Sequence, residues 1–238
     1  HRATEAGGPD GAEDVTFVTT DGHRLHGWLA GDQAGEGPVL LYCHGNAGNI
    51  THRASLLAGM READLAVLMF DYRGYGRSEG RPDEEGLYED ARAALAFLVE
   101  DRGVSPSRIV VHGQSLGGAV AIDLAAHADV AGLIVESSFT SVRDMAREIF
   151  GPIPLHLIAG SRFDSEAKVA GIGVPKLFMH GDRDDLIPYE MGVRLFEAAA
   201  EPKRFVRMEG ADHNSGPSVM GEAYYDAIAG FAYEAVSP

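Results

Sequence analysis

The stretch RIVVHGQSLGGAVAIDLAAHA (residues 108–128) predicts the architecture of the chain. A short run rich in Val and Ile passes through Gly113-Gln114-Ser115-Leu116-Gly117 directly into a segment whose apolar residues recur every three or four positions. A strand that turns straight into a helix at a Gly-x-Ser-x-Gly pattern predicts a nucleophile elbow, a strained turn that lifts the serine hydroxyl above the carboxyl edge of a sheet. Gly113 and Gly117 are required because side chains there would collide within the turn. Ser115 is therefore the candidate nucleophile.

The same pattern occurs a second time, as Gly76-Arg77-Ser78-Glu79-Gly80. Ser78 lies well past the end of its predicted strand, and Arg81-Pro82 follow it in place of an apolar helix. Structural context, rather than the bare pattern, supports such a motif. We therefore predict that Ser78 is a loop serine.

On both sides of the elbow, short apolar runs alternate with amphipathic stretches. Most of the runs are rich in Val, Ile and Leu on both faces, as strands buried between two helix layers must be. The predicted strands are 13–20 and 24–31, which form an antiparallel hairpin, and 38–43, 65–72, 108–113, 130–137, 174–181 and 203–210. The predicted helices are 54–63, 84–101, 116–128, 189–200 and 222–236. This alternation predicts an α/β fold with a mostly parallel, eight-stranded sheet and helices on both faces.

A chain of 238 residues is long enough for one sizeable core, and we predict a single domain over 13–238. Residues 1–12 are polar and rich in Gly and are expected to form a flexible N-terminal segment. The insertion 138–173, between the sixth and seventh strands, is predicted to form a small cap of one or two short helices. Apolar residues of this cap could line a substrate pocket or simply bury the cap against the body. The candidate pocket residues are Phe139, Phe150, Ile153, Leu155 and Leu157.

The formal net charge of −16 disfavours nucleic acid as a partner, because an acidic surface repels phosphate groups. No apolar run is long enough to span a membrane, although the absence of an initial Met leaves open that an anchor or export signal precedes this chain.

Cys43 lies in an apolar run and is predicted to be a buried structural thiol. No metal and no cofactor are expected, because His23 and His26 have no further ligands at metal-binding spacing. Compartment and oligomeric state stay open.

A serine hydroxyl is a poor nucleophile unless a neighbouring base takes its proton. In folds with this elbow the triad follows the chain order serine, acid, histidine. Of the 10 histidines, only His213 lies beyond the seventh predicted strand, in a loop at the same sheet edge as Ser115. The acid that orients it should follow the seventh strand, where Asp182, Asp184 and Asp185 are available. The residues alone do not choose sharply among these three carboxylates.

Six motifs, of which the elbow is one, extend the argument along the chain. They are HGNAGN (44–49), DYRGYGRSEG (71–80), GQSLGGAV (113–120), ESSFTS (136–141), HGDRDDLIP (180–188) and GADHN (210–214). With these motifs the chain resembles the α/β-hydrolase superfamily over roughly residues 13–234. It is most similar to a subgroup of small serine hydrolases that are often tethered by an N-terminal hydrophobic segment.

The resemblance assigns roles that the residues left open. It implies that Asp184 is the acid, with Asp185 as the fallback. It also implies that the backbone N–H groups of Asn46 and Leu116 form an oxyanion hole. The α/β-hydrolase fold, with the small cap between its sixth and seventh strands, is the expected architecture.

Three arginines, Arg73, Arg77 and Arg81, lie in the loop after the fourth strand. They could bind an acidic substrate group, but a solvated loop in which they pair with the acidic run 83–85 is the favoured interpretation. By resemblance, Asp71 and Arg73 brace the loops.

The expected reaction is acyl transfer from a small-molecule ester to water, with Ser115 as nucleophile and His213 as base. Because the predicted cap is small, we expect a carboxylesterase for short- to medium-chain acyl or aryl esters. A thioesterase or deacylase and a lipid acyl hydrolase use the same machinery and are alternatives. A non-catalytic ligand-binding protein on a hydrolase scaffold is the alternative from another class, because a fold does not guarantee activity.

Overall fold

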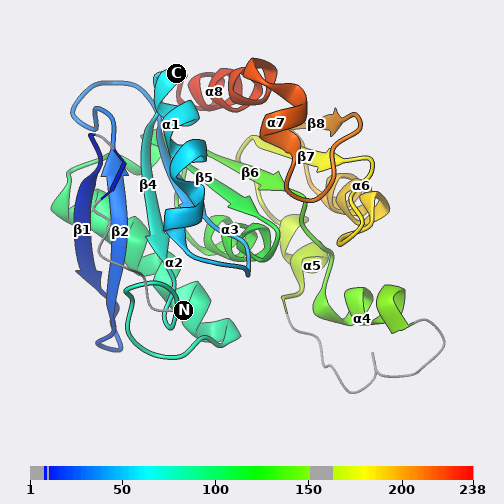
Figure 1. Cartoon of the computed structure of the whole chain (residues 1–238), viewed down its shortest axis with the longest axis horizontal. Coiled ribbons are helices and arrows are strands. Elements are labelled where there is room, and N and C mark those ends of the chain that lie inside the picture. The colour runs from blue at the N-terminus through cyan, green and yellow to red at the C-terminus, as the bar shows by residue number, and fades with distance from the viewer. Residues whose placement is uncertain (1–7, 10, 151–162, 238) are drawn as a thin grey trace.

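A computed structural model describes residues 8–9, 11–150 and 163–237. Within these residues, eight strands form one sheet in the order β1-β2-β4-β3-β5-β6-β7-β8 (Figure 1). The strands are β1 (Glu13–Val18), β2 (Arg24–Ala30), β3 (Val39–Cys43), β4 (Ala66–Asp71), β5 (Ile109–Gln114), β6 (Gly132–Glu136), β7 (Lys176–Gly181) and β8 (Lys203–Met208). β2 runs antiparallel to β1 and β4, whereas the strands from β3 to β8 pair in parallel. The predicted mostly parallel sheet is confirmed.

Helices cover both faces of the sheet (Figure 1). They are α1 (Ala54–Glu62), α2 (Glu84–Ala96), α3 (Leu116–His127), α4 (Val142–Phe150), α5 (Ser165–Val169), α6 (Tyr189–Ala198), α7 (Gly216–Met220) and α8 (Glu222–Val236), with short helical turns η1 (Ile50–Arg53), η2 (Phe97–Asp101) and η3 (Pro106–Arg108). Successive side chains of a strand point to opposite faces. Leu41 and Cys43 therefore pack into the core under α2 and α3, whereas Leu40 and Tyr42 pack into the core under α1 and α8. This two-sided burial explains why β3 is apolar at every position.

The predicted helices all form, with ends that differ by at most a few residues from the expected ones. The stretch expected as one helix over 84–101 is α2 followed by the π-helical turn η2. Three short elements, η1, η3 and α7, were not predicted. Segments of one turn carry too few residues to show an apolar period, so sequence periodicity cannot reveal them.

The parallel strands bring several loops to one edge of the sheet. The loops after β3, β5, β7 and β8 meet at the carboxyl edge, and α4 lies off this edge (Figure 1). α4 and α5 belong to the predicted cap, but its residues 151–162 lie outside the described residues, and with them Ile153, Leu155 and Leu157. The division into a body and a cap stays a prediction.

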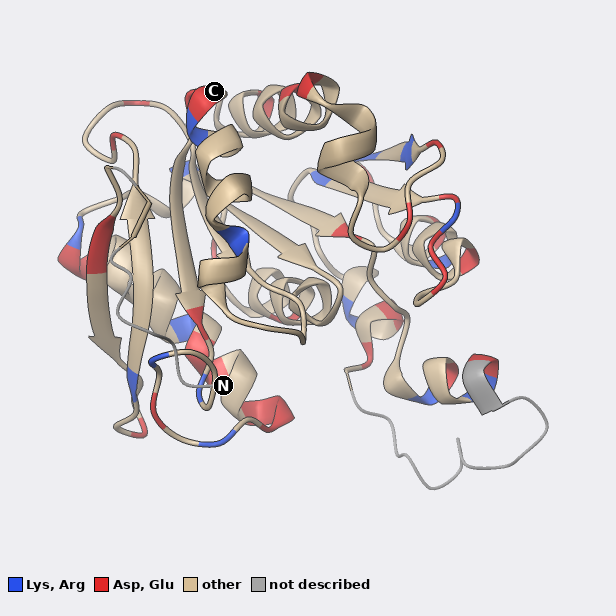
Figure 2. Ribbon diagram, in the orientation of Figure 1, with Lys and Arg blue, Asp and Glu red and all other residues tan. Residues whose placement is uncertain are grey.

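Charged residues lie mainly outside the sheet. Acidic residues are spread over loops and helix ends around the molecule (Figure 2), in keeping with the net charge of −16. Cys43 is buried, as its apolar run predicted, and burial raises the pKa of its thiol to about 12. Within the described ranges, no helix combines the length and the apolar character that a membrane span needs.

Candidate active site

Ser115 occupies the sharp turn between β5 and α3. Its φ of 57° and ψ of −120° are unfavourable for a residue with a side chain and cost on the order of 1–3 kcal/mol. Two hydrogen bonds hold the turn: the Ser115 amide donates to the Glu136 carbonyl at 2.8 Å, and the Ser138 hydroxyl donates to the Ser115 carbonyl at 2.8 Å. Ser138 was not singled out from the sequence, where its one signal is its place in the ESSFTS motif.

The glycines around Ser115 are required by close backbone contacts. A Cβ atom on Gly113 would lie 2.1 Å from the carbonyl oxygen of Gly117. A Cβ atom on Gly117 would lie 1.9 Å from the carbonyl oxygen of Cys43, at the end of β3. Both distances are far below van der Waals contact, so neither position can carry a side chain, as predicted; at Gly117 the obstacle is the end of β3 rather than the turn itself.

Three loops bring Ser115, His213 and Asp184 together. Oγ of Ser115 lies 3.0 Å from Nε2 of His213. Nδ1 of His213 lies 2.8 Å from Oδ2 of Asp184. Asp184 follows β7 and His213 follows β8, while Ser115 follows β5. The three side chains singled out from the sequence thus form one continuous line of contacts.

Asp184 sits in a pocket of hydrogen-bond donors. Its side chain is completely buried, and its Oδ1 accepts the backbone amides of Leu186 at 3.0 Å and Ile187 at 2.8 Å. Burial by itself raises the pKa of the Asp184 carboxyl, but hydrogen bonds from His180, His213 and the Ile187 amide outweigh it. The pKa therefore lies below its usual range, and the group is an anion at neutral pH.

The two other candidate acids have different surroundings. Asp182 contacts the Arg207 guanidinium at 2.7 Å and accepts the Gly210 amide at 2.7 Å. Asp185 is exposed on the loop. Of the three carboxylates considered, Asp184 is the one that contacts His213.

Ser78 has a different environment from Ser115. Its Oγ donates to the Asp71 carbonyl at 2.6 Å and accepts the His26 amide at 2.9 Å. Both bonds join the loop after β4 to the neighbouring strands, as expected for a loop serine. His26 itself contacts Asp14 at 2.6 Å. In the part of the chain that the structure describes, no group of three or more His, Cys, Asp or Glu side chains is arranged to hold a metal.

Asn46 and Leu116 lie beside Ser115 at the wall of a cavity. Leu116 is the first residue of α3, where backbone N–H groups have no acceptor within the helix. Asn46 follows β3, and its Oδ1 accepts the Tyr75 hydroxyl at 2.7 Å. Tyr75 was not singled out from the sequence, because nothing local links it to the HGNAGN motif.

The cavity has a volume of about 450 Å³ and is lined mainly by apolar side chains. Its lining residues are Asn46, Tyr75, Pro82, Asp83, Glu84, Leu87, Ser115, Leu116, Phe139, Val142, Met145, Phe163, Leu186 and Ile187. Of the predicted pocket residues, Phe139 lines it. The Phe150 side chain and residues Ile153, Leu155 and Leu157 are outside what the structure describes. Sequence reasoning missed the loop residues of the lining, such as Leu186, because isolated apolar residues in loops follow no period.

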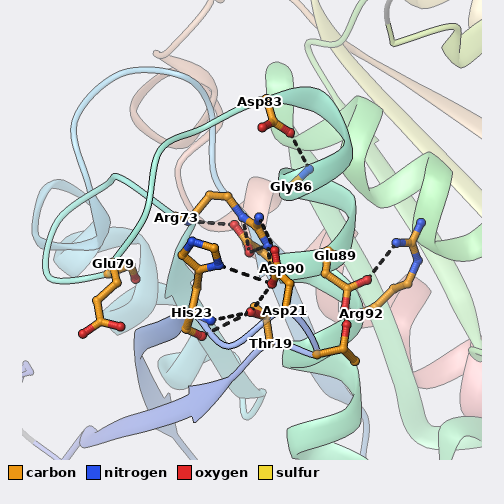
Figure 3. A network of polar contacts seen from close by, with 12 residues as sticks. Thr19, Asp21, His23, Arg73, Glu79, Asp83, Gly86, Glu89, Asp90 and Arg92 are labelled. Atoms are coloured by element: carbon orange, nitrogen blue, oxygen red, sulfur yellow. Dashed lines mark hydrogen bonds and ion pairs between the residues drawn. The ribbon is translucent and has the colours of Figure 1, made fainter.

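Arg73 braces the loop after β4 (Figure 3). Its guanidinium contacts Asp21 at 2.8 Å and Asp90 at 2.8 Å, and its backbone amide donates to Asp90 at 2.7 Å. The bracing role implied by resemblance agrees with these contacts. The expected pairing of the loop arginines with the acidic run 83–85 is wrong for Arg73 and for Arg77. The Arg73 side chain turns inward, where it covers Gly86 and meets carboxylates of α2 and the β1–β2 turn, and Arg77 pairs with Asp14 of β1.

Known proteins are similar to this chain in sequence and in fold. A family model described as serine aminopeptidase, S33, matches residues 36–161. The chain is 41% identical over 222 residues to an uncharacterised protein of Mycobacterium tuberculosis. The matched region covers 93% of this chain and 79% of that protein. It is 35% identical to protein bem46 of Schizosaccharomyces pombe, over 91% of this chain and 73% of that protein. The esterase Pf2001 of Pyrococcus furiosus has a similar fold, with a TM-score of 0.82 and 21% identity over 100% of this chain and 99% of that one. The chain therefore belongs to the α/β-hydrolase family that the serine aminopeptidase, S33, model describes.

Proposed function

We propose that this protein is a serine hydrolase that cleaves carboxylic esters through an acyl-enzyme, with Ser115 as nucleophile, His213 as general base and Asp184 as the orienting acid. The observation that carries the proposal is the line of contacts from Ser115 Oγ through the His213 ring to Asp184, at 3.0 and 2.8 Å. Nucleophile, base and orienting group within hydrogen-bond reach are the signature of an activated serine. The line begins at the wall of a cavity that a small molecule could enter.

In the first half-reaction, Ser115 Oγ attacks the ester carbonyl carbon while His213 Nε2 takes the hydroxyl proton. The tetrahedral intermediate then loses the alcohol, to which His213 returns the proton. In the second half-reaction, water attacks the acyl carbon and gives a proton to His213. The tetrahedral intermediate then releases the carboxylic acid, and His213 returns the proton to Ser115 Oγ, which restores the serine. Asp184 accepts the hydrogen bond from Nδ1–H throughout and does not take the proton, so Nε2 is the nitrogen that exchanges protons.

The developing oxyanion is held by the backbone N–H groups of Asn46 and Leu116. Both residues line the cavity beside Ser115, and the N-terminal end of α3 favours negative charge there. The Tyr75 hydroxyl holds the Asn46 side chain in place. Loss of one such donor typically costs about 2.7–4 kcal/mol of transition-state stabilisation.

The cavity supports the proposed substrate class. Its volume of about 450 Å³ and its walls of Leu87, Phe139 and Ile187 suit an apolar acyl or aryl group of modest size. Each buried CH₂ gains about 0.8 kcal/mol. The efficiency kcat/KM should therefore rise from acetyl esters to medium-chain esters and fall when the cavity is full.

The test combines covalent labelling with a panel of aryl esters of increasing acyl length. A fluorophosphonate should label Ser115, as mapped by mass spectrometry, and Ser115→Ala should lower kcat by about 10⁶-fold. Ser78→Ala is the matched control and should keep most of the activity. A folded wild-type protein that neither labels nor turns over any ester would contradict the proposal and favour a non-catalytic ligand-binding role. A steady rise in kcat/KM through palmitoyl esters would favour a lipid acyl hydrolase.

Aminopeptidase activity is the second candidate. It is supported by Asp83 and Glu84, which line the same cavity and could hold the protonated amine of a peptide. The family model also carries the description of an aminopeptidase. Both carboxylates have other partners, however: Asp83 accepts the Gly86 amide at 2.8 Å and Glu84 accepts the Phe163 amide at 2.6 Å. We therefore rank ester cleavage first.

Aminoacyl anilides with free and with acetylated amino groups separate the two activities. An aminopeptidase should cleave only the free-amine substrates and should lose this activity in Glu84→Gln. Glu85→Gln is the control, since Glu85 is exposed and is not among the lining residues. Turnover of esters without turnover of any free-amine anilide would contradict the second candidate.

A further inference from the structure

A second histidine contacts the same carboxylate oxygen as His213. Nε2 of His180, near the end of β7, lies 3.3 Å from Oδ2 of Asp184 and 3.0 Å from the carbonyl oxygen of Ile187. A carbonyl oxygen can only accept, so a hydrogen of the His180 ring is assigned to Nε2. This hydrogen is donated to the Ile187 carbonyl, and Oδ2 of Asp184 is a second, longer contact of the same nitrogen.

The His180 ring is held rigidly in its place. Only 1% of the residue is exposed. A Cβ atom on Gly192 of α6 would lie 2.2 Å from Nδ1 of His180, so glycine is needed there to make room for the ring. The ring of Tyr189 meets the His180 ring edge-on, with centroids 5.9 Å apart. These contacts leave the imidazole little freedom to turn away from Asp184.

The two oxygens of Asp184 are held differently. Oδ1 accepts two backbone amides, from Leu186 and Ile187, which belong to the acid's own loop. Oδ2 contacts two histidine nitrogens, Nδ1 of His213 at 2.8 Å and Nε2 of His180 at 3.3 Å. Without His180, the His213 ring would be the remaining partner of Oδ2 among the described residues, and this is the ring that the carboxylate has to orient. The acid's side chain is fully buried, so water does not readily replace the missing donor.

We propose that His180 is a positioning residue for the catalytic acid. Its Nε2–H links Asp184 Oδ2 to the Ile187 carbonyl, and the link keeps the carboxylate aimed at Nδ1 of His213. His180 is not among the residues that line the cavity, so it acts on the reaction through Asp184. The inference rests on the proposed serine-hydrolase function.

Two variants separate the donor from the ring. His180→Phe keeps a planar ring and removes the donor, whereas His180→Gln removes the ring and keeps an N–H donor at about the same distance from the backbone. The readouts are the rate of fluorophosphonate labelling of Ser115 and, for an aryl ester, kcat and KM. We expect His180→Phe to lower the labelling rate and kcat by about 10-fold or more, as for a lost hydrogen bond to a charged group, with KM changed less than about 2-fold. His180→Gln should recover most of the loss.

A purely structural role predicts the opposite order, with His180→Phe the more active variant. His180→Asn, whose amide is too short to reach Asp184, provides a second comparison with His180→Gln if the Phe variant does not fold; it should be the less active of the two. In an Asp184→Asn background, His180→Phe should cause no further loss, because both changes act through one carboxylate.

Three results would overturn the inference: wild-type rates in His180→Phe, a Gln variant no better than Phe or Asn, or a full further loss in the Asp184→Asn background. These results are distinct from failure of the proposed function. If the proposed function were wrong, the wild-type protein itself would neither be labelled by the fluorophosphonate nor hydrolyse the ester.

Discussion

Asp184 and Asp185 are neighbours in the chain but differ completely in their surroundings. The Asp184 side chain is buried and contacts His213 at 2.8 Å, whereas Asp185 is exposed on the loop surface. A loop gives successive side chains different directions, so the two carboxyl groups cannot both reach one imidazole. The chemistry of the proposed triad therefore depends on one residue position.

Replacing each aspartate by asparagine tests this difference. Asp184→Asn keeps the shape of the side chain but supports the wrong tautomer of His213, and we expect kcat to fall by about 10⁴-fold. Asp185→Asn should change the activation free energy by only about 0–1 kcal/mol, as for a solvated charge. The measurement is kcat for both purified variants, with circular dichroism as the control for folding. A crippled Asp185→Asn beside a healthy Asp184→Asn would move the orienting role by one residue.

The loop after β4 connects the brace in Figure 3 to the candidate active site. Arg73 ties the start of this loop to Asp90 of α2 and to Asp21 of the β1–β2 turn. Two residues later, Tyr75 lines the cavity and donates to Asn46. The ion pairs of Arg73 thus support the position of the Tyr75 hydroxyl, two residues further along the same loop.

Arg73→Met should destabilise the fold by about 3–5 kcal/mol, because it leaves the fully buried Asp90 carboxylate without its cation. Arg77→Met is the control from the same loop. Arg77 and its partner Asp14 are both substantially exposed, so its loss should cost about 0–1 kcal/mol. Urea unfolding at pH 7 measures both free energies. Equal, small losses in the two variants would show that Arg73 is no brace.

The stability of the whole molecule should depend on pH through buried and paired groups. Burial lowers the pKa of the His44 imidazole. For Asp14, Asp144 and Asp184, burial acts to raise the carboxyl pKa, but hydrogen bonds and nearby cationic groups outweigh it and lower the pKa. In each case the unfolded chain binds protons more readily than the folded protein. Acidification must therefore favour unfolding through these four groups.

The two kinds of group act in different pH windows. The stabilisation from His44 is complete above about pH 6.5 and is lost as the pH falls below that unfolded-state value. That from the three carboxylates is complete above about pH 4 and is lost below it. We expect the free energy of unfolding in urea to fall in two stages at about 0.5 M salt, which screens the repulsion within a chain of net charge −16. A free energy that is level from pH 7 down to pH 3 would contradict this assignment.

The amino-acid sequence by itself was sufficient for the architecture and for two of the three proposed triad positions. Strand and helix periods, read locally, predicted the sheet and its helices, because burial between two helix layers leaves its mark on every residue of a strand. The turn at Ser115 carries its own signal, since Gly113 and Gly117 are needed within a few bonds of the serine. Chain order then left His213 as the one histidine in the right region.

The remaining assignments depend on contacts between distant parts of the chain. The contact of His213 with Asp184 spans 29 positions, and that with Ser115 spans 98, so no local pattern specifies their geometry. The contact of His180 with Asp184 is between residues close in sequence (i,i+4), but it forms only when the loop after β7 folds back toward the strand. Arg73 likewise pairs with carboxylates 52 and 17 positions away instead of the nearby acidic run. The physical reason is that hydrogen bonds and ion pairs depend on distance in space, which the packing of helices on the sheet determines.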